Sequence, residues 1–136
     1  MTQHVLVWLL LEQEGAALLA RRKADRPPFA GQWTLPGDTM AIDESASETI
    51  ARCGREQLDV SVRSEDFVAT LDIAEDEIEY AVNVFRVAFL GRPRFRESGP
   101  YDEVRWLLPA DFADDSIVMP DALRDALIST ADGSTT

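Results

Sequence analysis

The first third of the chain alternates apolar segments with polar turns and predicts short strands. The segment His4 to Leu11 is continuously apolar and rich in branched side chains, which is typical of a strand buried on both faces. After the polar turn Glu12 to Gly15, the apolar stretch Ala16 to Arg22 predicts a hairpin partner for that strand. Gln32 to Leu35 predicts a further brief strand, and the segment Pro36 to Asp38 predicts the turn that closes it.

The apolar period changes between Asp43 and Leu58 and predicts the first helix. The helix-compatible positions recur there every three or four residues, at Ala46, Ile50, Cys53 or Gly54, and Leu58. Ser45 followed by Glu48 forms a capping-box pattern, while Asp43 is a competing cap. Gly54 costs about 1 kcal/mol relative to alanine in the middle of a helix, so it either admits a close neighbour or records a relaxed constraint.

The second half of the chain predicts a long hairpin and a closing helix. Phe67 to Ile73 and Ile78 to Leu90 are the two strands of the hairpin. The alternation within Ile78 to Leu90 changes parity midway, which predicts a bulge near Val84. Glu103 to Leu108 predicts the last strand, and Pro120 opens a C-terminal helix.

The order of these elements defines the fold class. Strands outnumber helices and do not alternate with them regularly, so the sequence predicts an α+β fold with a mixed sheet flanked by two helices. A Rossmann-like fold is not supported. A chain of 136 residues is long enough for one domain with its own core, so we assign residues 1–130 to a single domain and 131–136 to a flexible C-terminal tail.

Composition and charge narrow the class of partner. The net charge of −12 has the wrong sign for a phosphate backbone, which argues against a nucleic-acid polymer but leaves a small anionic ligand open. The longest apolar run, Val5 to Leu11, is too short to span a membrane. The lone Cys53 excludes an internal disulfide, and no leader pattern stands at the N-terminus, so we expect a soluble, cytoplasmic protein.

The most specific stretch lies between Gly31 and Val60. It reads Gly-Gln-Trp-Thr-Leu-Pro-Gly up to Gly37, then Glu44-Ser45, then Arg-Cys-Gly-Arg-Glu-Gln-Leu-Asp-Val from Arg52. This arrangement resembles the Nudix hydrolase superfamily, in which a strand ending Trp-x-Leu-Pro-Gly-Gly leads to a helix reading Arg-Glu-apolar-x-Glu-Glu-x-Gly-apolar, with a glutamate eight residues before the arginine. The spacing fits without a gap. The resemblance covers nearly the whole chain and implies a Nudix-like α/β/α sandwich.

The signature is only partly kept. Of its nine positions four match the family, namely Glu44, Arg52, Glu56 and Val60, and five depart from it, namely Asp38, Cys53, Gly54, Gln57 and Asp59. The resemblance implies that Gly37, Glu44 and Arg52 brace the loop against the helix. This structural role does not depend on catalysis.

The departures bear on metal binding. Positions 53, 56 and 57 share one helix face, and in the family all three are carboxylates, whereas here they are Cys53, Glu56 and Gln57. Magnesium prefers hard oxygen ligands, so the resemblance implies a weak Mg²⁺ or Mn²⁺ site if the protein is active, held by Glu56, Gln57 and Glu103. Glu97 and Asp102 are further acidic candidates. Cys53 is expected to be a small buried filler, and Gln57 a surface polar residue.

Several candidate site residues can each be interpreted in two ways, one functional and one structural. Glu56 is either a metal ligand and, with Glu103, a catalytic residue, or one member of an exposed i, i+4 ladder with Arg52. Arg22 and Arg26 belong to a basic cluster that either holds ligand phosphates or is solvated. Trp33 either stacks on a nucleobase or belongs to the core. A second basic set is less well placed: Arg92, Arg94 and Arg96.

Two functions from different classes therefore remain open. The first is a divergent Nudix-type hydrolase that cleaves the pyrophosphate bond of a nucleoside diphosphate linked to another moiety, weakened by the loss of metal-binding carboxylates. The second is a non-catalytic module of the same fold that binds a nucleotide-like ligand or a protein partner. The sequence does not decide whether the chain is an enzyme. A dimerisation domain with an empty cleft, or a homo-oligomer of either kind, is also left open.

Overall fold

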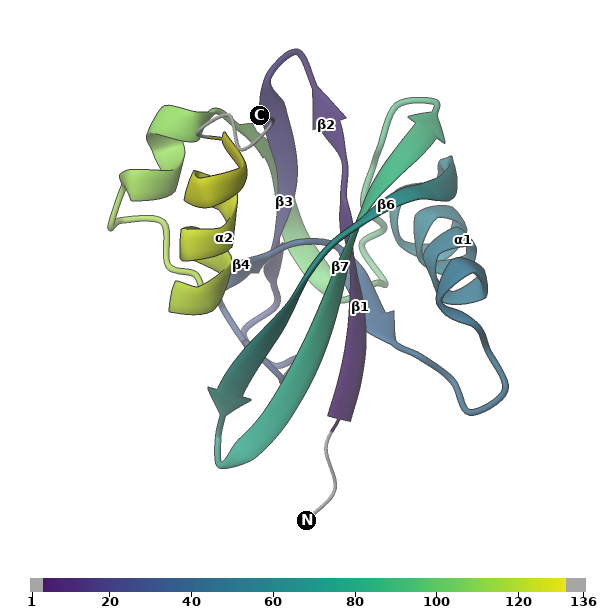
Figure 1. Cartoon of the computed structure of the whole chain (residues 1–136), viewed down its shortest axis with the longest axis horizontal. Coiled ribbons are helices and arrows are strands. Elements are labelled where there is room, and N and C mark those ends of the chain that lie inside the picture. The colour runs from purple at the N-terminus through teal and green to yellow at the C-terminus, as the bar shows by residue number, and fades with distance from the viewer. Residues whose placement is uncertain (1–3, 132–136) are drawn as a thin grey trace.

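The structure is a computed structural model that describes residues 4–131, and its strands form two sheets (Figure 1). The strands of the first sheet lie in the order β5 (Gly37–Thr39), β1 (His4–Leu10), β7 (Ile78–Leu90) and β6 (Ser61–Glu75). In the second sheet β3 pairs with the other three strands: β3 (Ala16–Arg22), β2 (Glu12–Gln13), β4 (Trp33–Thr34) and β8 (Tyr101–Leu107). The first sheet is mixed, because β1 runs parallel to β7 and antiparallel to β5.

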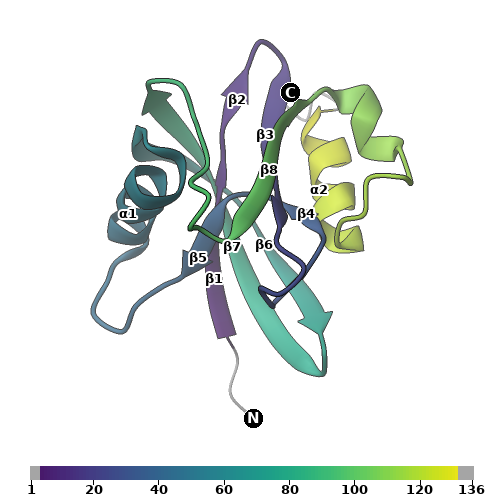
Figure 2. The ribbon, with the colours of Figure 1, turned by 180° about the vertical axis from the view of Figure 1, so that it is seen from behind.

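Two helices cover opposite sides of these strands, as the two views of Figures 1 and 2 show. The helix α1 (Ala46–Leu58) packs on β6, β5 and β1, whereas α2 (Asp121–Ala131) packs on β6 and on the short 3₁₀ helix η1 (Pro109–Ala113). This arrangement is the predicted α+β sandwich. Within the described residues no helix is long and apolar enough to cross a membrane.

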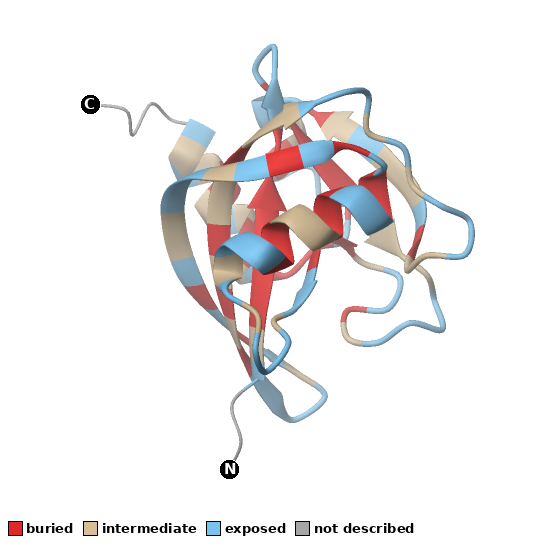
Figure 3. Cartoon of the chain, turned by 90° about the vertical axis from the view of Figure 1, so that its right-hand side faces the viewer, coloured by how far each residue is buried: buried red, intermediate tan, exposed pale blue. Residues whose placement is uncertain are grey.

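The central strand β1 contributes to two cores, as its continuous apolar sequence predicts. The side chains on one face of β1 join the core next to α2, and those on the other face join the core next to α1. The α2-side core takes Leu6, Trp8 and Leu10; the α1-side core takes Val7, Leu9 and Leu11. Figure 3 shows buried residues on the strands behind α1 and exposed residues on the outer side of that helix.

The hairpin of β6 and β7 corrects one expectation. The register of β7 against β1 is continuous, so the bulge predicted near Val84 is not in β7. The register shifts lie on β6 instead, between Ser64 and Asp66 and between Phe67 and Ala69. These residues pair with the segment of β7 around Val84. The apolar residues of β7 switch from even to odd positions because the strand contacts the α2-side core around Val84 and the α1-side core around Val87. Strand β6 also begins earlier than Phe67, because its first residues alternate in burial without forming an apolar run.

The start of α1 is capped as predicted. Ser45 is the N-cap and accepts a hydrogen bond from the Glu48 amide, while the Glu48 carboxylate accepts one from the Ser45 amide. The mid-helix Gly54 admits a close neighbour: a Cβ atom there would lie 2.4 Å from Val62 Cγ2 on β6. Glycine at this position therefore lets α1 approach the sheet closely.

The ends of several elements differ from the expectation. Gly37 belongs to strand β5 rather than to a turn, and a Cβ atom on it would lie 2.0 Å from the Val7 carbonyl oxygen of β1. The last strand begins at Tyr101, two residues before the predicted start. Helix α2 follows Pro120 as expected and includes Ala131, so assigning Ala131 to a C-terminal tail was wrong. The rest of that predicted tail, residues 132–136, lies outside the described residues.

Candidate functional site

A cleft of about 390 Å³ lies beside α1 and contains the largest group of predicted site residues. We call it the α1 cleft. It lies where the end of β3 and the loop after it, strand β5, helix α1 and the loop before β8 come together. Its charged and amide side chains are those of Arg22, Arg26, Asp38, Glu56, Gln57 and Arg96. A groove of about 350 Å³ between α1 and β6 is lined largely by small and aliphatic residues.

The amide of Gln57 is held inside the protein, so the expectation of a surface residue was wrong. Its Nε2 donates to the Gly37 carbonyl oxygen at 3.0 Å, and its Oε1 accepts from the Tyr101 hydroxyl at 2.8 Å. The Tyr101 oxygen in turn accepts from the Gly37 amide at 3.0 Å. We call these three residues the Gln57 clip. Tyr101 is fully buried, and this burial raises the pKa of its hydroxyl, which therefore stays protonated.

A second network braces the loop before α1. The Arg52 guanidinium donates to both carboxylate oxygens of Glu44, at 2.7 and 3.0 Å, in a two-pronged pair. Glu44 also accepts from the Ala41 amide and from the Thr49 hydroxyl, at 3.1 and 2.9 Å. These bonds, above all the one from Arg52, lower the pKa of Glu44 to about 2. The contact between Glu44 and Arg52 is the one that the resemblance implies for these positions.

The two carboxylates of the cleft differ in how strongly other groups of the protein already bind them. Asp38 accepts from Arg52 at 3.1 Å and from the Thr39 amide at 2.7 Å. The Glu56 side chain is 57% exposed, and its nearest cation is Arg52 at 3.7 Å. Glu56 is therefore the carboxylate of the α1 cleft that is most open to a ligand.

Cys53 lies behind this face of α1 rather than in the cleft. It is buried in the α1-side core, and the loss of solvent raises the pKa of its thiol to about 12, with Asp38 adding to the effect. A thiol with this pKa is uncharged near neutral pH, so it is neither a good nucleophile nor a good metal ligand. The expectation of a small buried filler agrees with this placement.

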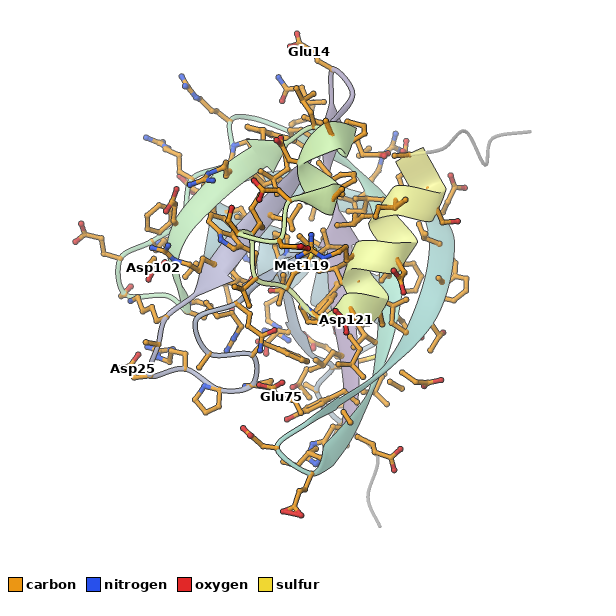
Figure 4. The ribbon with its side chains drawn as sticks, turned by 90° about the vertical axis from the view of Figure 1, so that its left-hand side faces the viewer. Glu14, Asp25, Glu75, Asp102, Met119 and Asp121 are labelled. Atoms are coloured by element: carbon orange, nitrogen blue, oxygen red, sulfur yellow. The ribbon has the colours of Figure 1, made fainter. Side chains whose placement is uncertain are left out.

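The structure does not bring Glu103 to the α1 cleft. Its carboxylate accepts from Arg105 at 2.9 Å and lies 3.5 Å from Arg21. The neighbouring Asp102 also pairs with Arg21, at 2.8 Å, and Figure 4 shows its side chain at the margin of the molecule. The register between β3 and β8 shifts beside Arg22, so Tyr101 and Glu103 are not related by simple alternation along the strand. Glu103 is consequently held in a surface ion-pair group.

Trp33 belongs to the α2-side core and is 6% exposed. The guanidinium groups of Arg105 and Arg21 lie over its ring, 5.0 and 5.7 Å from the centroid. Its ring is thus already covered by two side chains. Of the three residues predicted to bind substrate, the structure places Arg22 and Arg26 in the α1 cleft and Trp33 outside it.

Arg96, which the sequence offers only as part of a less well-placed basic set, also lines the α1 cleft. The loop that carries it lies against the C-terminal end of α1, where the Arg94 amide donates to the Leu58 carbonyl oxygen at 2.9 Å. Asp59, in a left-handed conformation with φ of 58°, places its carboxylate 3.6 Å from both Arg94 and Arg96. This contact brings Arg96 into the α1 cleft, a placement that no sequence motif marks.

The fold and the site together define a class of protein, an α+β sandwich with a charged cleft beside the helix of the signature. The NUDIX domain family matches residues 2–126, and the chain belongs to this family. Nucleoside triphosphatase NudI of Enterobacter sp. (strain 638) is 38% identical over 58 residues, 43% of this chain and 41% of the relative. The corresponding protein of Klebsiella pneumoniae (strain 342) is 40% identical over the same length. The chain thus spans about two-fifths of the length of these curated relatives.

Solved structures support the fold over nearly the whole chain. The MutT protein from Methanosarcina mazei Go1 superposes with a TM-score of 0.86 at 23% identity, covering 98% of this chain and 96% of its own. The E. coli ORF135 protein gives a TM-score of 0.76 at 23% identity, covering 98% and 94%. These similarities establish the Nudix fold.

The side chains of the α1 cleft fit a divalent cation poorly. Nudix hydrolases generally use divalent metal ions. Among the described residues, however, no three His, Cys, Asp or Glu side chains come together as a metal-binding group. Asp38 is engaged by Arg52, the oxygen of the Gln57 amide already accepts from Tyr101, and Glu56 stands without a second free carboxylate. Magnesium needs several hard oxygen ligands in octahedral geometry, which this set does not offer.

Proposed function

We propose that the protein is a divergent Nudix-type hydrolase that breaks the pyrophosphate bond of a nucleoside diphosphate linked to another moiety. The observation that supports this proposal is the α1 cleft, where Arg22, Arg26 and Arg96 lie around the signature residue Glu56. Three guanidinium groups in one cleft suit a diphosphate, because arginine matches phosphate oxygens in both charge and shape. With a net charge of −12 on the chain, a small nucleotide-like ligand is a better candidate than a nucleic-acid polymer.

The arginines and Glu56 each have a defined part in this proposal. The arginines orient the phosphates and offset the negative charge that develops as water attacks phosphorus. Glu56 is the exposed carboxylate that accepts the proton of the attacking water. The new bond joins the water oxygen to phosphorus, and the bridging oxygen leaves with the other phosphoryl group. Turnover is expected to be slow, because Cys53 and Gln57 stand at two positions where the family has carboxylates.

The names of similar proteins suggest which compounds to test. The NudI relatives are described as nucleoside triphosphatases, and structures with the same fold include a UDP-X diphosphatase and an ADP-ribose pyrophosphatase. A panel of nucleoside triphosphates, nucleoside diphosphate sugars, ADP-ribose and dinucleotides covers these classes.

A second candidate function is supported by the Gln57 clip. A module that binds a nucleotide-like ligand without hydrolysing it needs the arginines but no metal ligands. Both polar atoms of the Gln57 side chain make internal hydrogen bonds, so this signature position serves the fold rather than a metal ion. This observation favours binding without chemistry.

Phosphate-releasing hydrolysis of the panel, in Mg²⁺ or Mn²⁺ and with a phosphatase-coupled readout, distinguishes the two candidates. Turnover by the wild type that disappears in Glu56→Ala would support the hydrolase. The matched control is Asp125→Ala, which removes an exposed carboxylate from α2 and is expected to keep full turnover. No turnover of any compound, together with stabilisation of the folded protein by one of them, would support the binding module and reject the hydrolase.

A further inference from the structure

The Gln57 clip places a hydrogen where a metal-binding version of this site would need a cation. Position 57 carries a carboxylate in the family pattern, but here Nε2 of the amide donates to the Gly37 carbonyl oxygen at 3.0 Å. Two oxygens at this distance with no hydrogen between them would repel each other, and a cation would be needed to hold them together. The amide N–H group supplies the positive partner itself. In this chain the contact between α1 and β5 is therefore complete without a metal ion.

The charges around the α1 cleft favour an anion for the same reason. Three arginines and two carboxylates line it, which leaves a local excess of positive charge in a strongly acidic chain. The Asp38 carboxylate is directed to Arg52, a cation outside the cleft lining. A cation is not required to make this cleft attractive to phosphate.

Two of the arginines are available to a ligand. Arg26 makes no side-chain hydrogen bond or ion pair within the described part of the chain, and it is exposed. Arg96 has only long contacts, 3.6 Å to Asp59 and 3.5 Å to the Arg55 carbonyl oxygen. Arg22, in contrast, donates to the Arg26 carbonyl oxygen at 3.1 Å and so holds the loop that presents Arg26.

We propose that the α1 cleft binds a diphosphate group directly through Arg26 and Arg96, without a bridging divalent cation. The Gln57 clip takes over the structural part that such a cation would have. This inference deepens the proposed function, because it concerns the same cleft and defines how the ligand's phosphates are held. It concerns binding only, and it applies to a hydrolase and to a binding module alike.

Isothermal titration calorimetry with inorganic pyrophosphate tests this proposal on the wild-type chain, first in EDTA and then in Mg²⁺. We expect a measurable Kd in EDTA that Mg²⁺ does not tighten. Arg26→Ala and Arg96→Ala should each weaken binding about tenfold or more, since each removes charged hydrogen bonds to phosphate. Arg92→Ala is the charge-matched control, because Arg92 lies in the same loop as Arg96 but does not line the cleft, and its Kd should stay unchanged.

Three outcomes would overturn the inference: no pyrophosphate binding in EDTA, binding that appears only with Mg²⁺, or equal loss of affinity in the Arg92 control. These outcomes are distinct from failure of the proposed function. Pyrophosphate binding in EDTA without hydrolysis of any panel compound would reject the hydrolase and keep direct binding. Hydrolysis that accompanies strictly Mg²⁺-dependent binding would keep the hydrolase and reject direct binding.

Discussion

Replacing Gln57 by glutamate changes a single NH₂ group into an oxygen and directly tests the Gln57 clip. The bond from the Tyr101 hydroxyl, 2.8 Å long, can remain, because a carboxylate oxygen also accepts. The bond to the Gly37 carbonyl oxygen cannot remain when the new group is ionised, because neither oxygen carries a hydrogen. The substitution also restores the family's residue at this position, so the signature alone would predict no loss of stability.

The magnitude follows from burial and hydrogen bonding. Gln57 is 8% exposed, and a buried carbonyl that loses its donor costs about 1–3 kcal/mol. The introduced carboxyl group avoids part of this loss by keeping its proton, so its pKa in the folded protein is raised above about 4.3. A raised pKa of an acid means that stability is retained at low pH and lost as pH rises. We therefore expect a loss of about 2 kcal/mol at pH 7 that becomes smaller towards pH 4.

Urea unfolding followed by tryptophan fluorescence measures this loss in EDTA between pH 4 and pH 8. The matched control is Glu56→Gln, which makes the reverse change at the exposed neighbouring position and should shift the unfolding free energy by less than about 0.5 kcal/mol. Added Mn²⁺ should restore stability to the Gln57→Glu variant, because a cation can then join the two oxygens. The wild type should gain nothing from Mn²⁺.

Two results would refute this reasoning. If Gln57→Glu unfolds at the same urea concentration as the wild type at pH 7 in EDTA, the amide does not hold α1 to β5. If the deficit is equally large at pH 4 and pH 8, the loss does not come from an ionised oxygen that faces the Gly37 carbonyl.

Three further predictions concern the surroundings of the cleft. The pKa of Glu44 is lowered to about 2, so its contribution to stability is complete above pH 4.5 and is lost as pH falls towards 2. Glu44→Gln should therefore reduce the loss of unfolding free energy between pH 4.5 and pH 2. An unchanged loss over this range would contradict the role of the pair between Glu44 and Arg52. Gly54→Ala should lower the free energy of unfolding in urea by about 1 kcal/mol, because the new methyl group overlaps the stiff side chain of Val62. On an exposed helix the same substitution would stabilise. A gain in stability would show that this contact relaxes easily. Cys53, with a thiol pKa of about 12, should react with Ellman's reagent at pH 8 only after unfolding, and fast labelling of the native protein would contradict its burial.

The local signals of the fold could be read from the sequence. Apolar runs marked β1 and the two strands of the long hairpin, and Ser45 with Glu48 marked the start of α1, because these signals depend on residues close together in the chain. Strand β5 was not predicted, because its pairing depends on the close approach of Gly37 to β1. Such an approach is set by the tertiary fold and leaves no periodic pattern.

The candidate site was predictable where the signature helix and the basic cluster with Arg22 and Arg26 define it. Helical spacing placed Glu56 and Gln57 on one face of α1, but it did not show that Tyr101 and β5 would enclose Gln57. Arg96 reaches the cleft through the loop that Asp59 anchors, and the signal that could have suggested this is the basic loop itself. Glu103 was assigned from its place in the chain, whereas the irregular register between β3 and β8 controls where its side chain lies.

The position of β1 between the two cores has a consequence for how the molecule opens. Backbone amides of β1 are bonded to strands on both sides, and its side chains fill both cores at once. Opening one core alone would require β1 to leave the other as well, so we expect neither half to fold independently. Native-state hydrogen exchange should therefore find the slowest amides in β1 and β7, exchanging together through a single global event. The chain would then behave as one cooperative unit, although its apolar residues are divided between two layers.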